Sequence, residues 1–135
     1  MDLKLAVTAD FASTTAEGKL NILGIFDQMS PPSLPFALPL FYIVVTYEAG
    51  PAEVGTSKTT EIVLQDSDGG ARARLRQEIV VPPARRPGSR SVINQINALV
   101  GLQFEQAGDY QFVILVNGEE KGSLRLHVSE PMKQP

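Results

Sequence analysis

Two aspartates and two glycines in one short stretch are the first residues whose types could do chemistry. Asp66, Asp68, Gly69 and Gly70 follow an alternating apolar segment, and carboxylate and carbonyl oxygens are the ligands that Ca²⁺ prefers. A calcium loop also needs a third acid and a distant bidentate glutamate, which this stretch lacks. Asp-Gly is also a strong signal for a β-hairpin turn. The sequence therefore predicts a turn here, with no metal ligand and no cofactor.

His127, the single histidine of the chain, is the candidate for acid–base catalysis. It alternates with Leu126 and Val128, so its imidazole is expected on the solvent side of a strand. No Gly-x-Ser-x-Gly elbow accompanies it, and the sequence places no acid to orient it. The sequence therefore predicts no catalytic residue. An enzyme stays open as an alternative, and clustering of His127 with Asp10, Asp27 and an arginine would favour it.

Arginine is concentrated in one segment of an otherwise acidic chain. The net charge is -3, yet positions 72 to 90 hold six arginines against one glutamate, or +5, which leaves -8 for the rest. Such a patch attracts phosphates and carboxylates. The candidate anion-binding residues are Arg72, Arg74, Arg76, Arg85, Arg86 and Arg90. Nucleic acid is not an expected partner, because no aromatic residue interleaves the row for base stacking, and an ordinary solvated sheet face is the favoured reading.

Alternating apolar segments must position all of these residues. The chain has 135 residues and no cysteine, which is long enough for a core without disulfides or zinc. Period-two patterning predicts strands over 3–12, 19–28, 40–48, 59–65, 71–81, 110–116 and 124–128. In the first strand, Leu3, Leu5, Val7, Ala9 and Phe11 are expected to share one face.

Two further segments are less regular. Four prolines in 30–39 predict a crossing loop, because a central strand does not tolerate them. Segment 91–101 fits either a helix or a strand, and its β-branched residues and asparagines favour the strand. Together the elements predict an all-β protein, an antiparallel β-sandwich of about eight strands. Residues 1–130 would form one domain and 131–135 a frayed tail.

The two hairpins carry register predictions. With Asp68-Gly69 as a two-residue loop, the opposed pairs are Ile62 with Leu75, Leu64 with Ala73, Glu61 with Arg76 and Gln65 with Arg72. In the closing hairpin the inward residues are even-numbered on both sides of Asn117-Gly118. A two-residue loop would set Phe112 against Ser123, so the pattern predicts a loop of three or five residues or a bulge, with Gly118 or Gly122 left-handed.

Apolar residues on the face opposite to the core predict a subunit interface. They are Leu23 and Ile25, Tyr42 and Val44, and Val113 and Leu115. One sandwich has one interior, so these residues need a cover. The cover would be the proline loop, the 91–101 segment or another subunit, and homo-oligomerisation is the favoured outcome.

Two resemblances add to this reading. The motif Leu102-x-Phe104-x-x-x-Gly108-Asp109-Tyr110-x-Phe112 resembles the corner of immunoglobulin-like sandwiches. Ala9-Asp10-Phe11, the segment 18–27, the proline-rich loop and Leu64-x-Asp66-x-Asp68-Gly69 resemble a family of small bacterial proteins known as a domain of unknown function. The resemblance implies a compact bacterial domain and supplies no activity.

The function expected from the sequence is a non-catalytic interaction or assembly module, a homodimer or a component bound to a protein partner. The first residues lack a basic region followed by a continuous apolar run, and the nearly uncharged run 29–47 holds four prolines. No signal peptide and no membrane contact are therefore expected, and the cytoplasm is the expected location. An anion- or small-ligand-binding protein is the second alternative beside an enzyme.

Overall fold

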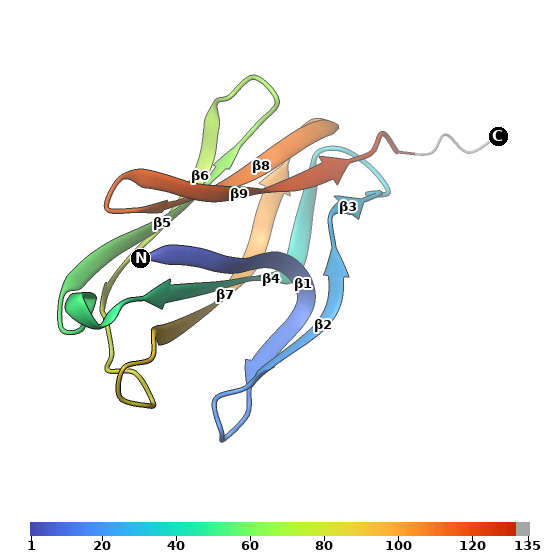
Figure 1. Cartoon of the computed structure of the whole chain (residues 1–135). Coiled ribbons are helices and arrows are strands. Elements are labelled where there is room, and N and C mark those ends of the chain that lie inside the picture. Colours follow the sequence, from blue (N-terminus) through green and yellow to red (C-terminus); the bar gives the residue numbers. More distant parts are fainter. Residues whose placement is uncertain (132–135) are drawn as a thin grey trace.

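The alternating segments form strands in two sheets that pack face to face, as the computed structural model describes for residues 1–131 (Figure 1). The four-stranded sheet has the order β2 (Leu20–Phe26), β1 (Asp2–Thr14), β4 (Phe36–Ala49), β7 (Ser91–Phe104). The five-stranded sheet has the order β3 (Gln28–Met29), β9 (Glu119–Val128), β8 (Gly108–Val116), β5 (Ser57–Gln65), β6 (Ala71–Val80). The predicted all-β sandwich is confirmed. The short β3, which is parallel to β9, brings the number of strands to nine.

The core lies between the sheets and consists of every second residue of the central strands. It contains Phe41, Ile43, Val45, Tyr47, Ile62, Leu64, Phe104, Tyr110, Phe112, Ile114, Val116, Leu126 and Val128. Tyr110, Phe112, Ile114 and Val116 of β8 and Leu126 and Val128 of β9 point inward as the alternation predicts, with Leu124 packed at the margin. Segment 132–135, most of the predicted tail, lies outside the described residues.

Three polar side chains are buried within this core, those of Gln95, Thr60 and Tyr47. The Gln95 side chain donates to the hydroxyl of Thr60 at 2.9 Å, and both residues are buried. The hydroxyl of Tyr47 is buried without a hydrogen-bond partner among the described residues. Burial raises the pKa of Tyr47 to about 12, and the nearby Thr60 hydroxyl opposes this rise without meeting hydrogen-bond geometry.

The prediction that the odd-numbered apolar residues of β1 share one face is wrong after Leu3. The register with β4 shifts between Leu3 and Leu5, which makes Lys4 a bulge. Leu3 still packs against the core, and Ala6 follows it there. A bulge turns the side chains that follow it to the other face. Val7 and Ala9 consequently lie opposite Val44 and Tyr42 on the outer face of the four-stranded sheet.

The predicted loop over 30–39 is wrong at its C-terminal end, because β4 begins at Phe36 and runs through Pro39. Pairing of β1 with β4 covers only 42–48, so Pro39 has no neighbour on that side. On the other side its partner position is Gly101, where the ladder with β7 skips a pair. Pro39 therefore owes no ladder hydrogen bond, which is the condition for proline in a strand.

The β5–β6 hairpin has the predicted register over most of its length. Ile62 lies opposite Leu75, Leu64 opposite Ala73 and Glu61 opposite Arg76. The register then shifts, so that Gln65 faces Ala71 and not Arg72. The predicted two-residue loop is wrong, because the turn spans Asp66 to Gly70 with Gly69 left-handed at φ 83°. Gly69 thus sits one position later in the turn than a tight Asp-Gly loop would place it.

The β8–β9 hairpin resolves the conflict between its turn and its pattern by a bulge. Phe112 lies opposite Leu124, as the core requires, and the register shifts between Ile114 and Leu115. The predicted three- or five-residue loop is wrong. Asn117 and Gly118 form a two-residue turn with φ of 50° and 80°, and the left-handed Gly118 is confirmed.

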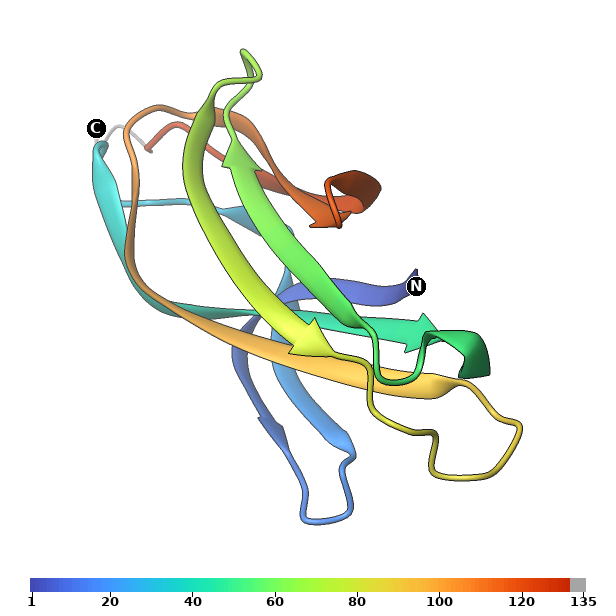
Figure 2. The same cartoon turned by 90° about the vertical axis from the view of Figure 1, so that its left-hand side faces the viewer.

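Segment 91–101 is part of strand β7, so the prediction of a strand rather than a helix is confirmed. β7 pairs with β4 along nearly its whole length, and Figure 2 shows the two running side by side below β5 and β6. Figures 1 and 2 also show the β1–β2 hairpin and the loop before β7 projecting away from the five-stranded sheet.

Helical structure in the described residues is limited to one short turn, η1 (Pro51–Glu53). Within 1–131 there is accordingly no helix with the length and hydropathy that crossing a membrane requires.

Candidate functional site

The six arginines predicted as one basic surface lie in two separate groups. Arg72, Arg74 and Arg76 belong to β6, and Arg85, Arg86 and Arg90 to the loop between β6 and β7. β6 rises by about 3.3 Å per residue, so its two ends are roughly 30 Å apart. The pocket lined by Arg85, Arg86 and Arg90 contains none of the three β6 arginines, so the six do not form one site.

In the β6 group, two of the three cations are already paired. Arg74 Nη1 lies 2.6 Å from Glu61 Oε2, and Arg72 Nε lies 2.8 Å from Asp66 Oδ2. Glu61 faces Arg76 in the register, yet its carboxylate pairs with Arg74. These pairs leave the outer surface of β6 close to neutral.

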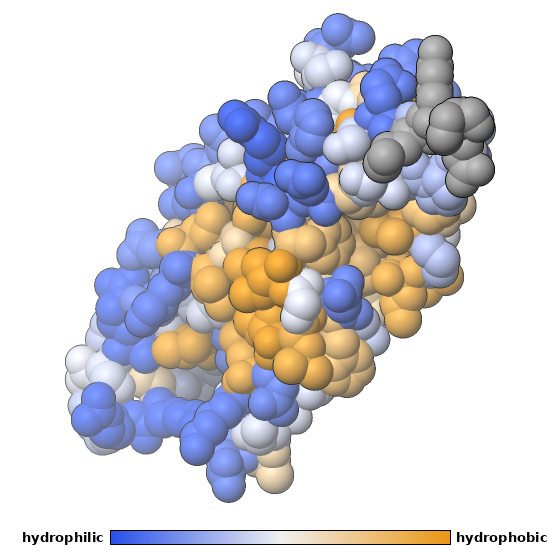
Figure 3. Space-filling view, turned by 90° about the vertical axis from the view of Figure 1, so that its right-hand side faces the viewer, coloured by the Kyte–Doolittle hydropathy of each residue, from blue (hydrophilic) through white to orange (hydrophobic). Residues whose placement is uncertain are grey.

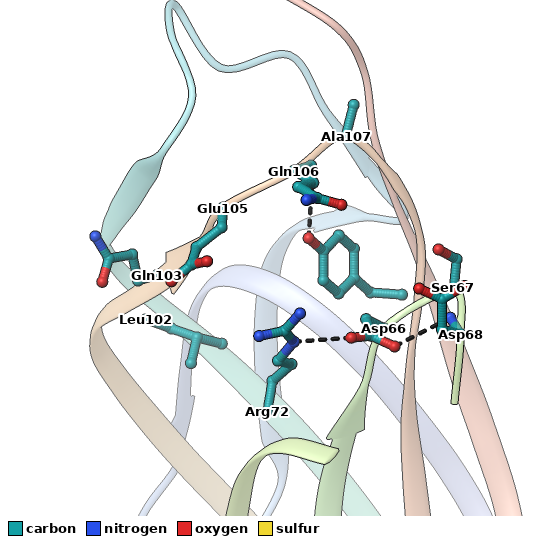
Figure 4. Close-up of a pocket in the computed structure, with 10 residues that line it drawn as sticks. Asp66, Ser67, Asp68, Arg72, Leu102, Gln103, Glu105, Gln106 and Ala107 are labelled. Atoms are coloured by element: carbon teal, nitrogen blue, oxygen red, sulfur yellow. Dashed lines mark hydrogen bonds and ion pairs between the residues drawn. The ribbon is translucent and has the colours of Figure 1, made fainter. Parts of the chain in front are cut away.

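Asp66 holds the turn of the β5–β6 hairpin (Figure 4). Its Oδ1 accepts from the backbone N–H groups of Gly70 at 2.9 Å and Asp68 at 3.0 Å. The hydrogen bond from Gly70, followed by that from Arg72, holds the pKa of Asp66 below its usual range, and the contact with Asp66 raises the pKa of Arg72. Both carboxylate oxygens are thus engaged within the hairpin, Oδ1 by the turn and Oδ2 by Arg72. In residues 1–131 no group of three or more His, Asp or Glu side chains lies close enough to hold a metal ion.

A shallow pocket of about 220 Å³ lies beside this turn. Figure 4 shows Asp66 and Arg72 on one side of it and Gln106 on the other. The hydroxyl of Tyr110 donates to the backbone oxygen of Gln106 at 2.6 Å. The polar side chains of Asp66, Arg72 and Tyr110 at this pocket are therefore already engaged within the protein.

The loop group of arginines lines a larger cleft of about 640 Å³. Its walls come from the 82–90 loop, from Gly18 in the β1–β2 turn and from the first residues of β7. Arg90 Nη2 lies 2.6 Å from Asp2 Oδ2, and its Nε lies 3.4 Å from Glu48 Oε2. Within 1–131 neither Arg85 nor Arg86 forms an ion pair with a carboxylate. Two unneutralised guanidinium groups therefore face this cleft.

His127 has an acidic partner that the sequence analysis missed. Asp109 of β8 lies directly opposite it, and His127 Nδ1 is 2.7 Å from Asp109 Oδ1. The even-numbered register of the closing hairpin was the signal that could have found this pair. The predicted cluster for an enzyme is not assembled around it: Asp27 contributes its backbone carbonyl to His127 N–H, and the Asp10 side chain lies against Gly24.

Four of the six residues predicted for a subunit interface share one outer face. Ile25 lies opposite Ala9, Ala9 opposite Tyr42, and Tyr42 opposite Ala98, so this row crosses all four strands. Leu23 lies opposite Phe11, whose ring contacts that of Tyr42 edge-on at 5.6 Å between centroids. Val44 lies between Val7 and Ile96. We call these rows, with Leu40 opposite Val100, the apolar face.

Much of the apolar face is open to solvent. The exposed large side chains are Phe11, Leu23, Ile25, Leu40 and Val100. Figure 3 shows a contiguous hydrophobic area with hydrophilic residues on both sides of it. Ala9 and Val44, by contrast, are completely buried although they lie outside the core cluster.

Val113 and Leu115 are not part of the apolar face, because β8 belongs to the other sheet. Val113 lies between Val63 and Ser123 and is 6% exposed. Leu115 lies between Glu61 and Glu120. Long charged side chains on this outer surface can cover apolar neighbours with their stems, so these two residues do not form an open patch.

The fold and these surfaces define a small all-β sandwich with one open apolar face and one basic cleft. The chain belongs to the family described as "Family of unknown function (DUF6941)", whose model matches residues 4–129. This confirms the resemblance to a domain of unknown function noted from the sequence. No curated protein matches the sequence.

Proposed function

We propose that this protein is a non-catalytic β-sandwich module that binds a second copy of itself through the apolar face. The observation that carries the proposal is the exposure of large apolar side chains in adjacent rows on β1, β2, β4 and β7. Side chains of this kind favour burial by about 25 cal/mol for each Å² removed from water. A soluble monomer gains nothing by displaying them together, whereas an interface does.

The composition of the apolar face suits a twofold-symmetric dimer. A twofold axis sets a patch against a copy of itself, so a charge at its centre would meet a charge of the same sign. None of the residues that form the face is charged. A partner of different chemistry would instead be matched by complementary charges.

The free edge of β2 supports the same dimer. In the described chain β2 pairs only with β1, and its seven residues include no charge and no proline. Exposed edges without such protection pair readily with further strands. A strand paired with its twofold copy is antiparallel, which would join two four-stranded sheets into one of eight. By contrast, the edge strand β6 carries Arg72, Arg74, Arg76 and Glu78.

The size of the face sets what else the interface must contain. The five exposed side chains, with exposed fractions from 45% to 80%, together present roughly 500 Å² of apolar surface. A stable interface buries about 800 Å² on each partner. The apolar face would therefore form the centre, with β2 backbone pairing and polar neighbours as the rim.

Light scattering of the purified protein tests this proposal with a matched pair of variants. Leu23→Lys with Ile25→Lys places charge on β2, where the side chains are 61% and 63% exposed, and should convert a dimer to a monomer. Val80→Lys changes a residue of 62% exposure on β6 and should leave the dimer intact. A wild-type monomer at high concentration, or a dimer that survives the β2 charges, would overturn the proposal.

A bacterial origin and a cytoplasmic location are part of the same proposal. The resemblance of the sequence to a family of small bacterial proteins supports them. Cell fractionation followed by detection of the native protein tests the location.

A further inference from the structure

The cleft between the 82–90 loop and the β1–β2 turn offers a binding site of a different kind from the apolar face. We infer that it binds a small organic anion, with a phosphate or carboxylate group held by Arg85 and Arg86. Arginine is suited to such groups because its planar guanidinium donates two parallel hydrogen bonds to them.

The charge balance of the cleft favours an anion. Its lining includes one carboxylate, Glu48, which already accepts from Lys4 Nζ at 2.7 Å and lies 3.4 Å from Arg90. Arg85 and Arg86 have no ion pair with a carboxylate within residues 1–131. The lining therefore carries an excess of positive charge in a protein of net charge -3.

The absence of a side chain at Gly18 makes room for Arg85 at the cleft. Its guanidinium lies over Gly18, with Nη2 in the space where a Cβ atom would project and Cζ 3.2 Å from that position. Gly18 has φ 83°, which glycine adopts without strain. The β1–β2 turn thus leaves room for a cation that comes from a distant loop.

The remaining lining favours an anion with an apolar body. Pro82, Pro83 and the half-exposed Val92 contribute apolar surface. Asn94 also lines the cleft, and its amide oxygen accepts from the hydroxyl of Thr46 at 2.8 Å. A volume of about 640 Å³ is within the range of small-molecule sites. Ser89 also lines the cleft, but its hydroxyl already donates to the backbone oxygen of Arg86 at 2.7 Å.

Calorimetric titration with phenyl phosphate, benzoate and inorganic phosphate tests the site in the full chain. Phenyl phosphate or benzoate should bind, and the tighter of the two identifies the anionic group. Arg85→Gln with Arg86→Gln should weaken that binding by about 10- to 100-fold, from the loss of charge-assisted hydrogen bonds. The control, Arg72→Gln with Arg74→Gln, removes the same charge from β6 and should leave the affinity unchanged.

A glycine pair tests the placement of Arg85 without altering any charge. Gly18→Ala should displace the guanidinium and weaken binding, whereas Gly69→Ala has the same φ of 83° with open space around it and should not. The inference is overturned if none of the three probes binds, if the β6 control loses as much affinity as the loop variant, or if Gly18→Ala binds like the wild type. Inorganic phosphate that binds as tightly as phenyl phosphate would overturn the apolar part of the site.

Discussion

Asp109 and His127 lie opposite each other on β8 and β9, with Oδ1 and Nδ1 2.7 Å apart on the surface of the five-stranded sheet. Their side chains are 59% and 47% exposed, and exposed pairs of this kind contribute at most about 1 kcal/mol. We expect a double-mutant cycle of Asp109→Ala and His127→Ala, measured by urea unfolding, to give a coupling below about 1 kcal/mol. A much larger coupling would contradict the reading of an ordinary surface pair.

The hydroxyl of Tyr47, which has no hydrogen-bond partner within residues 1–131, predicts an unusual response to mutation. A buried donor without a partner costs roughly 1–3 kcal/mol of desolvation, so Tyr47→Phe should leave the free energy of unfolding unchanged or raise it by up to about that amount. Denaturant unfolding measures the change. A loss of stability would show that the hydroxyl finds a partner in solution.

Tyr110 provides the matched control for that experiment. Its hydroxyl donates to Gln106 O at 2.6 Å, and the residue is 6% exposed. Tyr110→Phe removes a satisfied hydrogen bond and should lower the free energy of unfolding by about 1 kcal/mol. The two phenylalanine variants should therefore differ in sign or in size.

Gly24 of β2 lies against the Asp10 side chain, and we expect this contact to make it more sensitive to substitution than Gly101. Both have φ 69°, so alanine at either position carries the same left-handed strain of about 1–2 kcal/mol. A Cβ at Gly24 would also meet the Asp10 side chain, with Cγ at 2.8 Å, whereas the space around Gly101 is open. Gly24→Ala should therefore lower the thermal midpoint further than Gly101→Ala. Adding Asp10→Ala should recover the difference, and equal losses without it would contradict the contact.

From the contacts of Glu53 we expect the free energy of unfolding to fall at acid pH. Its carboxylate accepts from the N-terminal ammonium of Met1 at 2.8 Å, from Lys58 at 3.0 Å and from Gly50 N–H at 3.0 Å. These contacts, that of Met1 largest, lower the pKa of Glu53 from 4.5 to about 2. A lowered folded-state pKa stabilises above the unfolded value, and this contribution is lost as the pH falls from 4.5 toward 2.

Urea unfolding of the wild type and Glu53→Gln over this pH range measures the effect. The wild type should be the more stable above pH 4.5, and the difference should shrink toward pH 2. A difference that stays constant with pH would show that the carboxylate charge is not the cause.

Alternation in the sequence predicted the strands and the core because one face of each central strand is buried. It failed at bulges, since one extra residue leaves the local pattern intact. Leu3, Leu5 and Val7 alternate without a break, yet Lys4 bulges out and the later residues change face. The outer face of this sheet is apolar too, so both arrangements set apolar side chains beside apolar neighbours.

The candidate surfaces were predictable only as far as they depend on single strands. Leu23 with Ile25 and Tyr42 with Val44 share a face because their strands lie in one sheet, and Val113 does not because β8 lies in the other. Sheet membership depends on long-range pairing, which local patterning does not contain. The contact of Arg85 with Gly18 joins two loops that are far apart in the sequence. The local sequence of neither loop predicts it.

The break in the β4–β7 ladder at Gly101 has a consequence for assembly beyond a dimer. β7 forms the outer edge of the four-stranded sheet over 14 residues and carries no charge to repel another strand. If two copies join at β2, a β7 edge lies at each end of the combined sheet, and straight uncharged edges would let dimers add to one another into filaments. At Gly101, with φ 69° and Pro39 across from it, the edge bends. An incoming strand can then follow it only in part, which favours a closed assembly over open-ended growth.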